Sequence, residues 1–349
     1  MLTDALMALI LLFLGCLLIV RDSKGKASSF FDLQNSNCLR GFWCLVIVLV
    51  HIPQEYQNFL QDAVGSFAYI GVSFFFMTSG YGLVLSVKRD PNSIKKAFWR
   101  RRLVRLLVPL LLVNMVTFVI RAAAAGELDL LQLVAVTAFV RQILLFYALF
   151  WLVFRCLPEK VAHRTKILLL SLAVVVFSLA IYFARENLLF GWPVESMGFL
   201  YGILLAECKA WFESRACRKT FVKIAAAAIL SAVFGILYLK YKHIFFAGEY
   251  LVKLALGVAI LLLMLLLNTK FSVGNPVSRF LGSISYEVYL SHNAVFILLA
   301  ALPVKLASGV FVTLSLVFTV AVSYVVKLCG SSIIKLFDKV LFIGCSKNV

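Results

Sequence analysis

Charge is scarce in this sequence, and acidic residues are the scarcest charged group. Only 14% of the 349 residues are charged, with 34 Lys and Arg against 16 Asp and Glu. A soluble globular domain has about a quarter of its residues charged, so the composition excludes an ordinary soluble enzyme. Long polar stretches are also lacking, and we therefore expect no second, soluble domain.

Metal-binding patterns are lacking as well. The eight cysteines form no C-x-x-C pair and no close cluster with any of the four histidines. Structural zinc sites and disulfide frameworks typically show such spacings. We therefore predict free thiols, no disulfide framework and no metal cofactor.

Hydrophobic residues are abundant instead, at 63% of the chain with a mean hydropathy of +1.00. Apolar runs of about 20 residues recur, and that is the length a helix needs to cross a bilayer. We predict an all-α fold, a polytopic transmembrane bundle of ten or eleven membrane-spanning helices. The predicted spans are residues 3–20, 39–56, 64–87, 103–121, 142–157, 167–184, 192–208, 222–239, 250–267, 282–301 and 308–328.

Basic residues divide unequally between alternate loops. The loops 21–40, 88–105, 155–166, 209–223 and 270–279, together with the chain after 326, hold 27 of the 34 Lys and Arg residues. Because positive charge marks the cytoplasmic side, we predict a multi-pass protein of the cell membrane, with its N-terminus outside and its C-terminus inside. The same distribution explains the net charge of +18 without a nucleic-acid partner.

The segment "LRGFWCLVIVLVH" places Arg40 and His51 in one apolar run. Eleven residues of α-helix return to within about 20° of the same face and rise roughly 16 Å. The pair therefore shares a face, with Arg40 near the cytoplasmic surface and His51 deep in the membrane or beyond it. A snorkelling arginine with an interfacial histidine and a functional pair both fit this spacing.

The segment "KKAFWRRRLVRLLVP", residues 95–109, precedes and enters a predicted span. Arg102 and Arg105 are three residues apart and share a helix face. We expect them at a helix N-terminus, where the helix dipole favours an anion such as phosphate. A role as positive-inside charge alone is the alternative interpretation.

The segment "LGSISYEVYLSHN", residues 281–293, is unusually polar for a membrane helix. Its Glu287 and His292 lie on adjoining turns, and ionisable groups inside a membrane indicate a polar cavity. The small residues of "GVSFFFMTSGYGL", residues 71–83, favour close helix packing. The polar residues of the first segment are Ser283, Ser285, Tyr286, Glu287, Tyr289, Ser291, His292 and Asn293.

Taken in order, these motifs resemble those of the acyltransferase-3 superfamily of integral membrane acyltransferases. The Arg-x10-His pattern matches Arg40 and His51, "FFMTSGYG" matches the Phe-Phe-x-x-Ser-Gly-Tyr stretch, and Arg102 and Arg105 match Arg-x-x-Arg. The late Ser-Tyr-x-x-Tyr-Leu-x-His motif matches Ser285 to His292. The resemblance implies an acyltransferase domain over residues 30–328. Residues 1–29 then form an extra membrane helix with a basic cytoplasmic loop, and residues 329–349 a short cytoplasmic tail.

The resemblance implies O-acyl transfer, most often acetyl, from cytoplasmic acyl-CoA to a hydroxyl of a glycan on the outer side, within membrane lipids. Arg102 and Arg105 would hold the phosphates of acetyl-CoA or another acyl-CoA. His51 would take the proton of the attacking hydroxyl, because imidazole changes charge near neutral pH. The group that stabilises the oxyanion is left open, and the candidates are Arg40, Tyr286, Ser285 and His292. Glu287 and Tyr289 are further candidates for binding the substrate. An acyl-histidine intermediate remains the other route.

Two other classes of protein compete with the enzyme. A transporter or flippase for a lipid-linked glycan or small metabolite would usually show an internal repeat or matched broken helices, and the sequence lacks both. A purely structural membrane subunit has no use for the Arg40 and His51 pair. Which glycan or small molecule accepts the acyl group, and the oligomeric state, stay open.

Overall fold

The computed structural model describes residues 2–23, 30–94, 98–184, 191–216 and 218–343, and this part of the chain is an all-α bundle. Eight of its helical segments are long and apolar enough to cross a membrane. The helices are α1 (Leu2–Leu17), α2 (Leu33–Val50), α3 (Phe59–Gly65), α4 (Ala68–Arg89), α5 (Phe98–Ala125), α6 (Ala138–Cys156), α7 (His163–Ala184), α8 (Pro193–Glu207), α9 (Lys209–Ala216), α10 (Thr220–Tyr241), α11 (Lys253–Lys270), α12 (Pro276–Ser283), α13 (Ser285–Ala300) and α14 (Ser308–Ile343). Short helical turns are η1 (Gln54–Tyr56), η2 (Pro91–Ile94), η3 (Leu130–Val134) and η4 (Ala247–Val252), and the strands are β1 (Val20–Ser23) and β2 (Phe271–Val273).

Each predicted span corresponds to a helix, but several boundaries differ from the prediction. The span predicted at 39–56 is α2, which begins six residues earlier because Asp32 Oδ1 accepts the Asn35 backbone N–H at 2.7 Å and caps the helix. Pro53 follows its end, and a residue that precedes proline is unfavourable in helical conformation. Arg40 therefore lies two turns inside α2, and not at its start.

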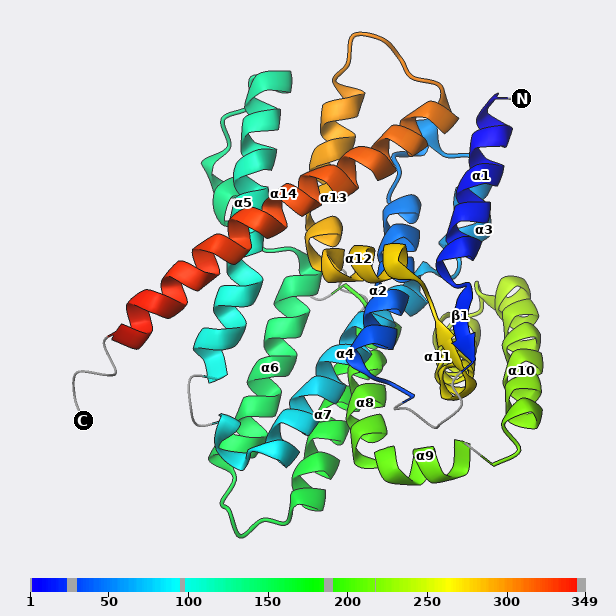
Figure 1. Ribbon diagram of the computed structural model, residues 1–349, viewed down its shortest axis with the longest axis vertical. Helices are drawn as coiled ribbons and strands as arrows, with labels where there is room; N and C mark the ends of the chain where they lie inside the picture. The colour runs from blue at the N-terminus through cyan, green and yellow to red at the C-terminus, as the bar shows by residue number, and fades with distance from the viewer. Residues whose placement is uncertain (1, 24–29, 95–97, 185–190, 217, 344–349) are drawn as a thin grey trace.

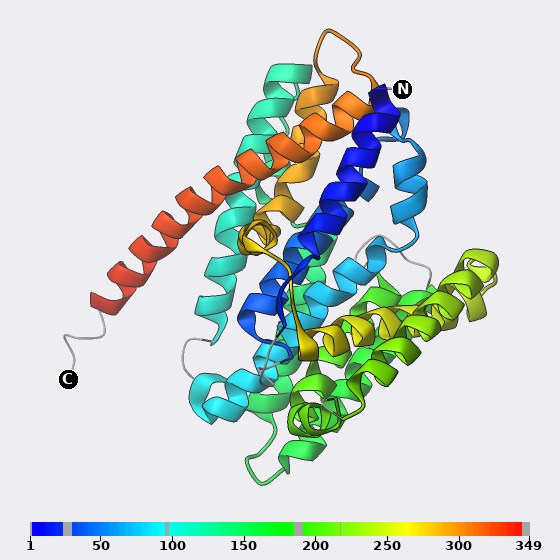
Figure 2. The same cartoon turned by 45° about the vertical axis from the view of Figure 1, so that its right-hand side comes forward.

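Other corrections concern the C-terminal third. The span predicted at 282–301 is preceded by a separate short helix, α12, which the Asn275 side chain caps. The last span continues without a break to Ile343, so part of the predicted tail is helix α14. Its end projects away from the bundle in both views (Figures 1 and 2).

Helices α4 and α8 pack closely against each other through glycines. A Cβ atom on Gly80 would lie 2.4 Å from the Phe199 carbonyl oxygen, and one on Gly202 would lie 2.1 Å from the Met77 carbonyl oxygen. Small residues allow membrane helices to pack backbone against backbone. The "FFMTSGYG" segment therefore packs as expected, and it positions α4 beside the interior cavities described below.

Contacts between loops show which loops lie on the same side of the bundle. Strands β1 and β2 pair antiparallel, with Val20 opposite Val273. At the other side, the Ser308 hydroxyl donates to the Tyr56 carbonyl at 2.6 Å and accepts from Asn58 Nδ2 at 2.8 Å. These pairings agree with the alternation of loops that the charge distribution predicts.

Candidate functional site

A large cavity of about 1050 Å³ opens between α2, α4, α5, α6, α13 and α14. Its lining includes the start of α2, the end of α4, the start of α5 and part of α9. These segments lie in or next to the loops with most of the basic residues. Five basic side chains, Arg40, Arg105, Lys209, Lys327 and Lys335, line the cavity with two acidic ones, Asp32 and Glu287.

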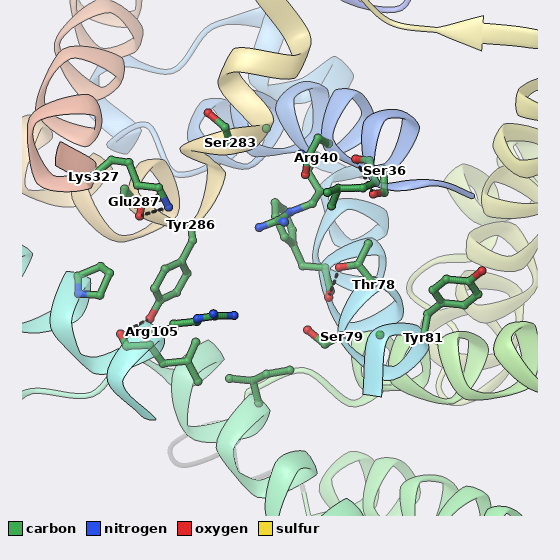
Figure 3. A pocket seen from close by; sticks show the side chains of 18 of the residues that line it. Ser36, Arg40, Thr78, Ser79, Tyr81, Arg105, Ser283, Tyr286, Glu287 and Lys327 are labelled. Carbon is green, nitrogen blue, oxygen red and sulfur yellow. Dashed lines mark hydrogen bonds and ion pairs between the residues drawn. The ribbon is translucent and has the colours of Figure 1, made fainter. Parts of the chain in front are cut away.

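Arg40 points into this cavity from α2 (Figure 3). Its guanidinium carbon lies 5.5 Å from the centroid of the Phe75 ring. The Nε atom is buried and has no hydrogen-bond partner among the described residues. An arginine with an unpartnered buried donor is a candidate for binding an anionic group of a ligand.

The two arginines on α5, Arg102 and Arg105, lie in different environments. Arg105 is exposed and points into the cavity opposite Arg40 (Figure 3). Arg102 does not line the cavity, because its guanidinium packs 4.7 Å from the Phe98 ring centroid and 5.0 Å from that of Tyr147. The prediction of a helix N-terminus at these arginines was wrong, since α5 begins at Phe98 and its free N–H groups precede both.

The polar segment 281–293 spans the end of α12 and the start of α13. Only some of its residues face the same cavity. Tyr286, Glu287 and Ser283 line it (Figure 3). The Tyr286 hydroxyl donates to the Leu106 carbonyl at 2.8 Å, close to the position where Pro109 interrupts the hydrogen bonding of α5. Ser285 lies outside the lining, and its hydroxyl donates to the Gly282 carbonyl at 2.8 Å.

Glu287 forms an ion pair across the cavity wall. Its Oε1 lies 3.1 Å from Lys327 Nζ on α14, and the glutamate is only 2% exposed. The second carboxylate oxygen is buried and without a hydrogen-bond partner in the described part of the chain. Pairing with Lys327 reduces the cost of keeping this charge inside a membrane protein.

A second, smaller cavity of about 240 Å³ lies at the other end of α2 and contains His51. His51 is the C-cap of α2, and its Nδ1 lies 2.7 Å from the Ile47 carbonyl oxygen. Because a carbonyl only accepts, this contact requires the proton on Nδ1 and leaves Nε2 as an acceptor. An imidazole in this tautomer can take a proton from a hydroxyl.

His292 lies against His51, with ring centroids 5.0 Å apart. It is 3% exposed, and neither ring nitrogen has a hydrogen-bond partner among the described residues. Tyr289 lines the small cavity, whereas Phe139 lines the large one, and their ring centroids are 5.0 Å apart. This pair of rings therefore lies between the two cavities.

Comparison with known families gives the class of this protein. Residues 33–328 match the profile of the acyltransferase-3 family, described as an acyltransferase domain. The chain belongs to the acyltransferase-3 family. No curated protein and no solved structure gives a significant match.

As an acyltransferase-3 member with a bundle of apolar helices, the protein is a membrane acyltransferase. The matched range covers every predicted site residue. The structure brings these residues to two places: Arg40, Arg105, Tyr286 and Glu287 line the large cavity, and His51 and Tyr289 line the small one beside His292. Arg102 and Ser285 lie outside both linings.

Two charged residues of the small cavity were missed by the sequence analysis of this acyltransferase-3 chain. Glu195 and Lys253 lie in α8 and α11 and form an ion pair of 2.8 Å that lines the cavity with His51. A signal existed, because each is an ionisable residue inside a predicted span, which by itself marks a functional candidate. Among the described residues no cluster of three or more metal-ligating side chains is found.

Proposed function

We propose that this protein transfers an acyl group, in the first place acetyl, from cytoplasmic acyl-CoA to a hydroxyl of an extracytoplasmic or lipid-linked glycan. The observation that carries the proposal is that Arg40, in the middle of α2, and His51, at its C-terminal end, each line a cavity of their own. A basic cavity suits an anionic donor. An imidazole with a free ring nitrogen suits a hydroxyl acceptor.

The large cavity is the proposed donor site. Its volume of about 1050 Å³ reaches the upper end of the range for small-molecule pockets, and its excess of basic side chains complements the phosphates of CoA. Arg105 and Arg40 point into it from two sides (Figure 3). The charge distribution of the loops supports an opening towards the cytoplasm, where acyl-CoA is available.

The reaction is acyl transfer by nucleophilic attack. The acceptor hydroxyl oxygen attacks the thioester carbonyl carbon while its proton passes to His51 Nε2, and the CoA thiolate leaves and takes up a proton. The developing oxyanion needs a donor. Because the hydroxyls of Tyr286 and Ser285 already donate to backbone carbonyls and Arg40 lines the other cavity, His292, which packs against His51, is the better candidate for this role.

Donor turnover tests the proposal. The purified protein in lipid nanodiscs is expected to release CoA from radiolabelled acetyl-CoA and to transfer the label to glycan extracted from the cell envelope. A transporter or flippase would move a glycan without consuming the thioester. Absence of acetyl-CoA binding and of CoA release would contradict the proposed function.

Arg105→Ala is expected to weaken acetyl-CoA binding by about tenfold or more, because hydrogen bonds to a charged partner contribute roughly 1.5–3 kcal/mol. Arg105→Lys recovers part of the affinity, since an ammonium lacks the planar guanidinium fork. Titration calorimetry with acetyl-CoA at several salt concentrations measures both.

The matched control is Arg101→Ala, on the same helix, exposed and outside the cavity lining. It is expected to leave binding within about twofold of the wild type, since salt screens distant exposed charges. Equal losses in the Arg101 and Arg105 variants would mean that general positive charge, and not this position, attracts the donor.

A further inference from the structure

The small cavity contains an ion pair that none of the recognised motifs includes. Lys253 Nζ lies 2.8 Å from Glu195 Oε1, and both side chains line the cavity that holds His51. Glu195 is 4% exposed. An ionised carboxylate in such a position is costly unless it is paired and hydrogen-bonded.

The second oxygen of the Glu195 carboxylate has no hydrogen-bond partner among the described residues. This atom, Oε2, is buried, whereas Oε1 is paired with Lys253. A buried acceptor without a partner destabilises the folded state by about 1–3 kcal/mol. It is therefore a position where a ligand that donates a hydrogen bond gains affinity.

The two charged groups are held in place from several sides. Glu195 is the third residue of α8, where the helix dipole favours a negative charge. Lys253 Nζ lies 4.6 Å from the Tyr69 ring centroid, and the Tyr69 hydroxyl donates to the Lys253 carbonyl at 2.7 Å.

The backbone before Lys253 is irregular. The six residues Ala247–Val252 form a π-helical turn, and Phe246 before it has φ of 55°, a left-handed value unusual for a residue with a side chain. Single π turns occur frequently at functional sites. Here the turn leads directly into Lys253, the first residue of α11.

We infer that Glu195 Oε2 binds a hydroxyl of a neutral, polyhydroxylated acceptor, next to the hydroxyl that His51 deprotonates. This inference rests on the proposed function and specifies its acceptor side. Four aromatic side chains suited to the apolar face of a sugar ring also line the cavity, namely Tyr69, Trp192, Tyr238 and Tyr289.

The charge of the cavity determines which acceptors fit. Glu195 and Lys253 neutralise each other, in contrast to the donor cavity with its excess of basic residues. An anionic acceptor would place its charge beside the free carboxylate oxygen, and like charges repel strongly in a low-dielectric site. A neutral sugar is therefore preferred over its uronic acid.

The experiment uses the protein in lipid nanodiscs with radiolabelled acetyl-CoA and two probes, octyl β-D-glucoside and octyl β-D-glucuronide. The wild type is expected to acetylate the glucoside at least tenfold more efficiently than the glucuronide. Glu195→Gln is expected to raise KM for the glucoside about tenfold or more, with acetyl-CoA binding within twofold of wild type because Glu195 does not line the donor cavity. Glu55→Gln is the matched control, because Glu55 is exposed in η1 and lies outside the cavity lining.

A double variant, Glu195→Gln with Lys253→Met, separates binding from folding. It removes both charges, so a role in stability alone predicts that it recovers the wild-type KM, whereas acceptor binding predicts a KM that stays raised. A wild-type KM in the double variant, or no preference for the glucoside, would overturn the inference. Failure of acetyl-CoA binding in the wild type would instead overturn the proposed function.

Discussion

His51→Ala is expected to reduce acetyl transfer by about 10²–10⁴-fold, the usual contribution of a general base. The physical reason is the fixed tautomer: Nδ1 donates to the Ile47 carbonyl at 2.7 Å, so Nε2 is the ring atom able to accept a proton. Alanine removes this acceptor without disturbing α2, because His51 is the C-cap and is exposed in its cavity. Radiolabel transfer from acetyl-CoA measures the loss, and circular dichroism verifies the fold.

His243→Ala is the control for this variant, since His243 is exposed in the loop after α10 and lines neither cavity. It is expected to retain wild-type transfer. Acetyl-CoA binding is expected to be unchanged in both variants, because the donor cavity does not include His51. A folded His51→Ala protein that transfers acetyl at the wild-type rate would leave His51 with a structural role only.

Gly80→Ala is expected to destabilise the protein by about 1–3 kcal/mol, the range for overpacking of a close contact. The new methyl group would lie 2.4 Å from the Phe199 carbonyl oxygen, a backbone atom that moves only if α8 moves with it. Because Glu195 is in the first turn of α8, displacement of this helix also disturbs the small cavity. Thermal unfolding in detergent gives the change in stability.

Gly82→Ala, two residues further along the same helix, is the matched comparison. Nothing lies within 4 Å of a Cβ atom at Gly82, and alanine has a helix propensity better than glycine by about 1 kcal/mol. A small increase in thermal stability is therefore expected. Equal effects of the two substitutions would show that propensity, and not helix contact, decides the stability of α4.

Hydrophobic patterning was sufficient to predict the bundle. An apolar run of about 20 residues has to satisfy its backbone hydrogen bonds internally, and a helix does so independently of its neighbours. Boundaries were less accurate, as at α2 and α14, because they depend on caps and on the absence of a breaker. The Asp32 cap was not recognised, so the helix was expected to begin next to Arg40, whereas Arg40 lies two turns inside α2.

The candidate site was predicted in part. Spacing along one helix was enough to separate Arg40 from His51, because the rise per residue is constant. The i, i+3 spacing of Arg102 and Arg105 placed them on one face, but it could not show that only Arg105 reaches the cavity. That difference comes from the aromatic rings of Phe98 and Tyr147, which hold the Arg102 guanidinium.

By itself, the sequence determined the all-α membrane fold, the loops that share a side, and the order of motifs that marks an acyltransferase. These depend on local properties, namely hydropathy, charge and residue spacing. Only the tertiary structure decided that Glu195 meets Lys253 across 58 residues of chain and that Phe139 and Tyr289 lie between the two cavities. Such contacts depend on how each helix is rotated about its axis, and that rotation is set by the packing of helices far apart in the sequence.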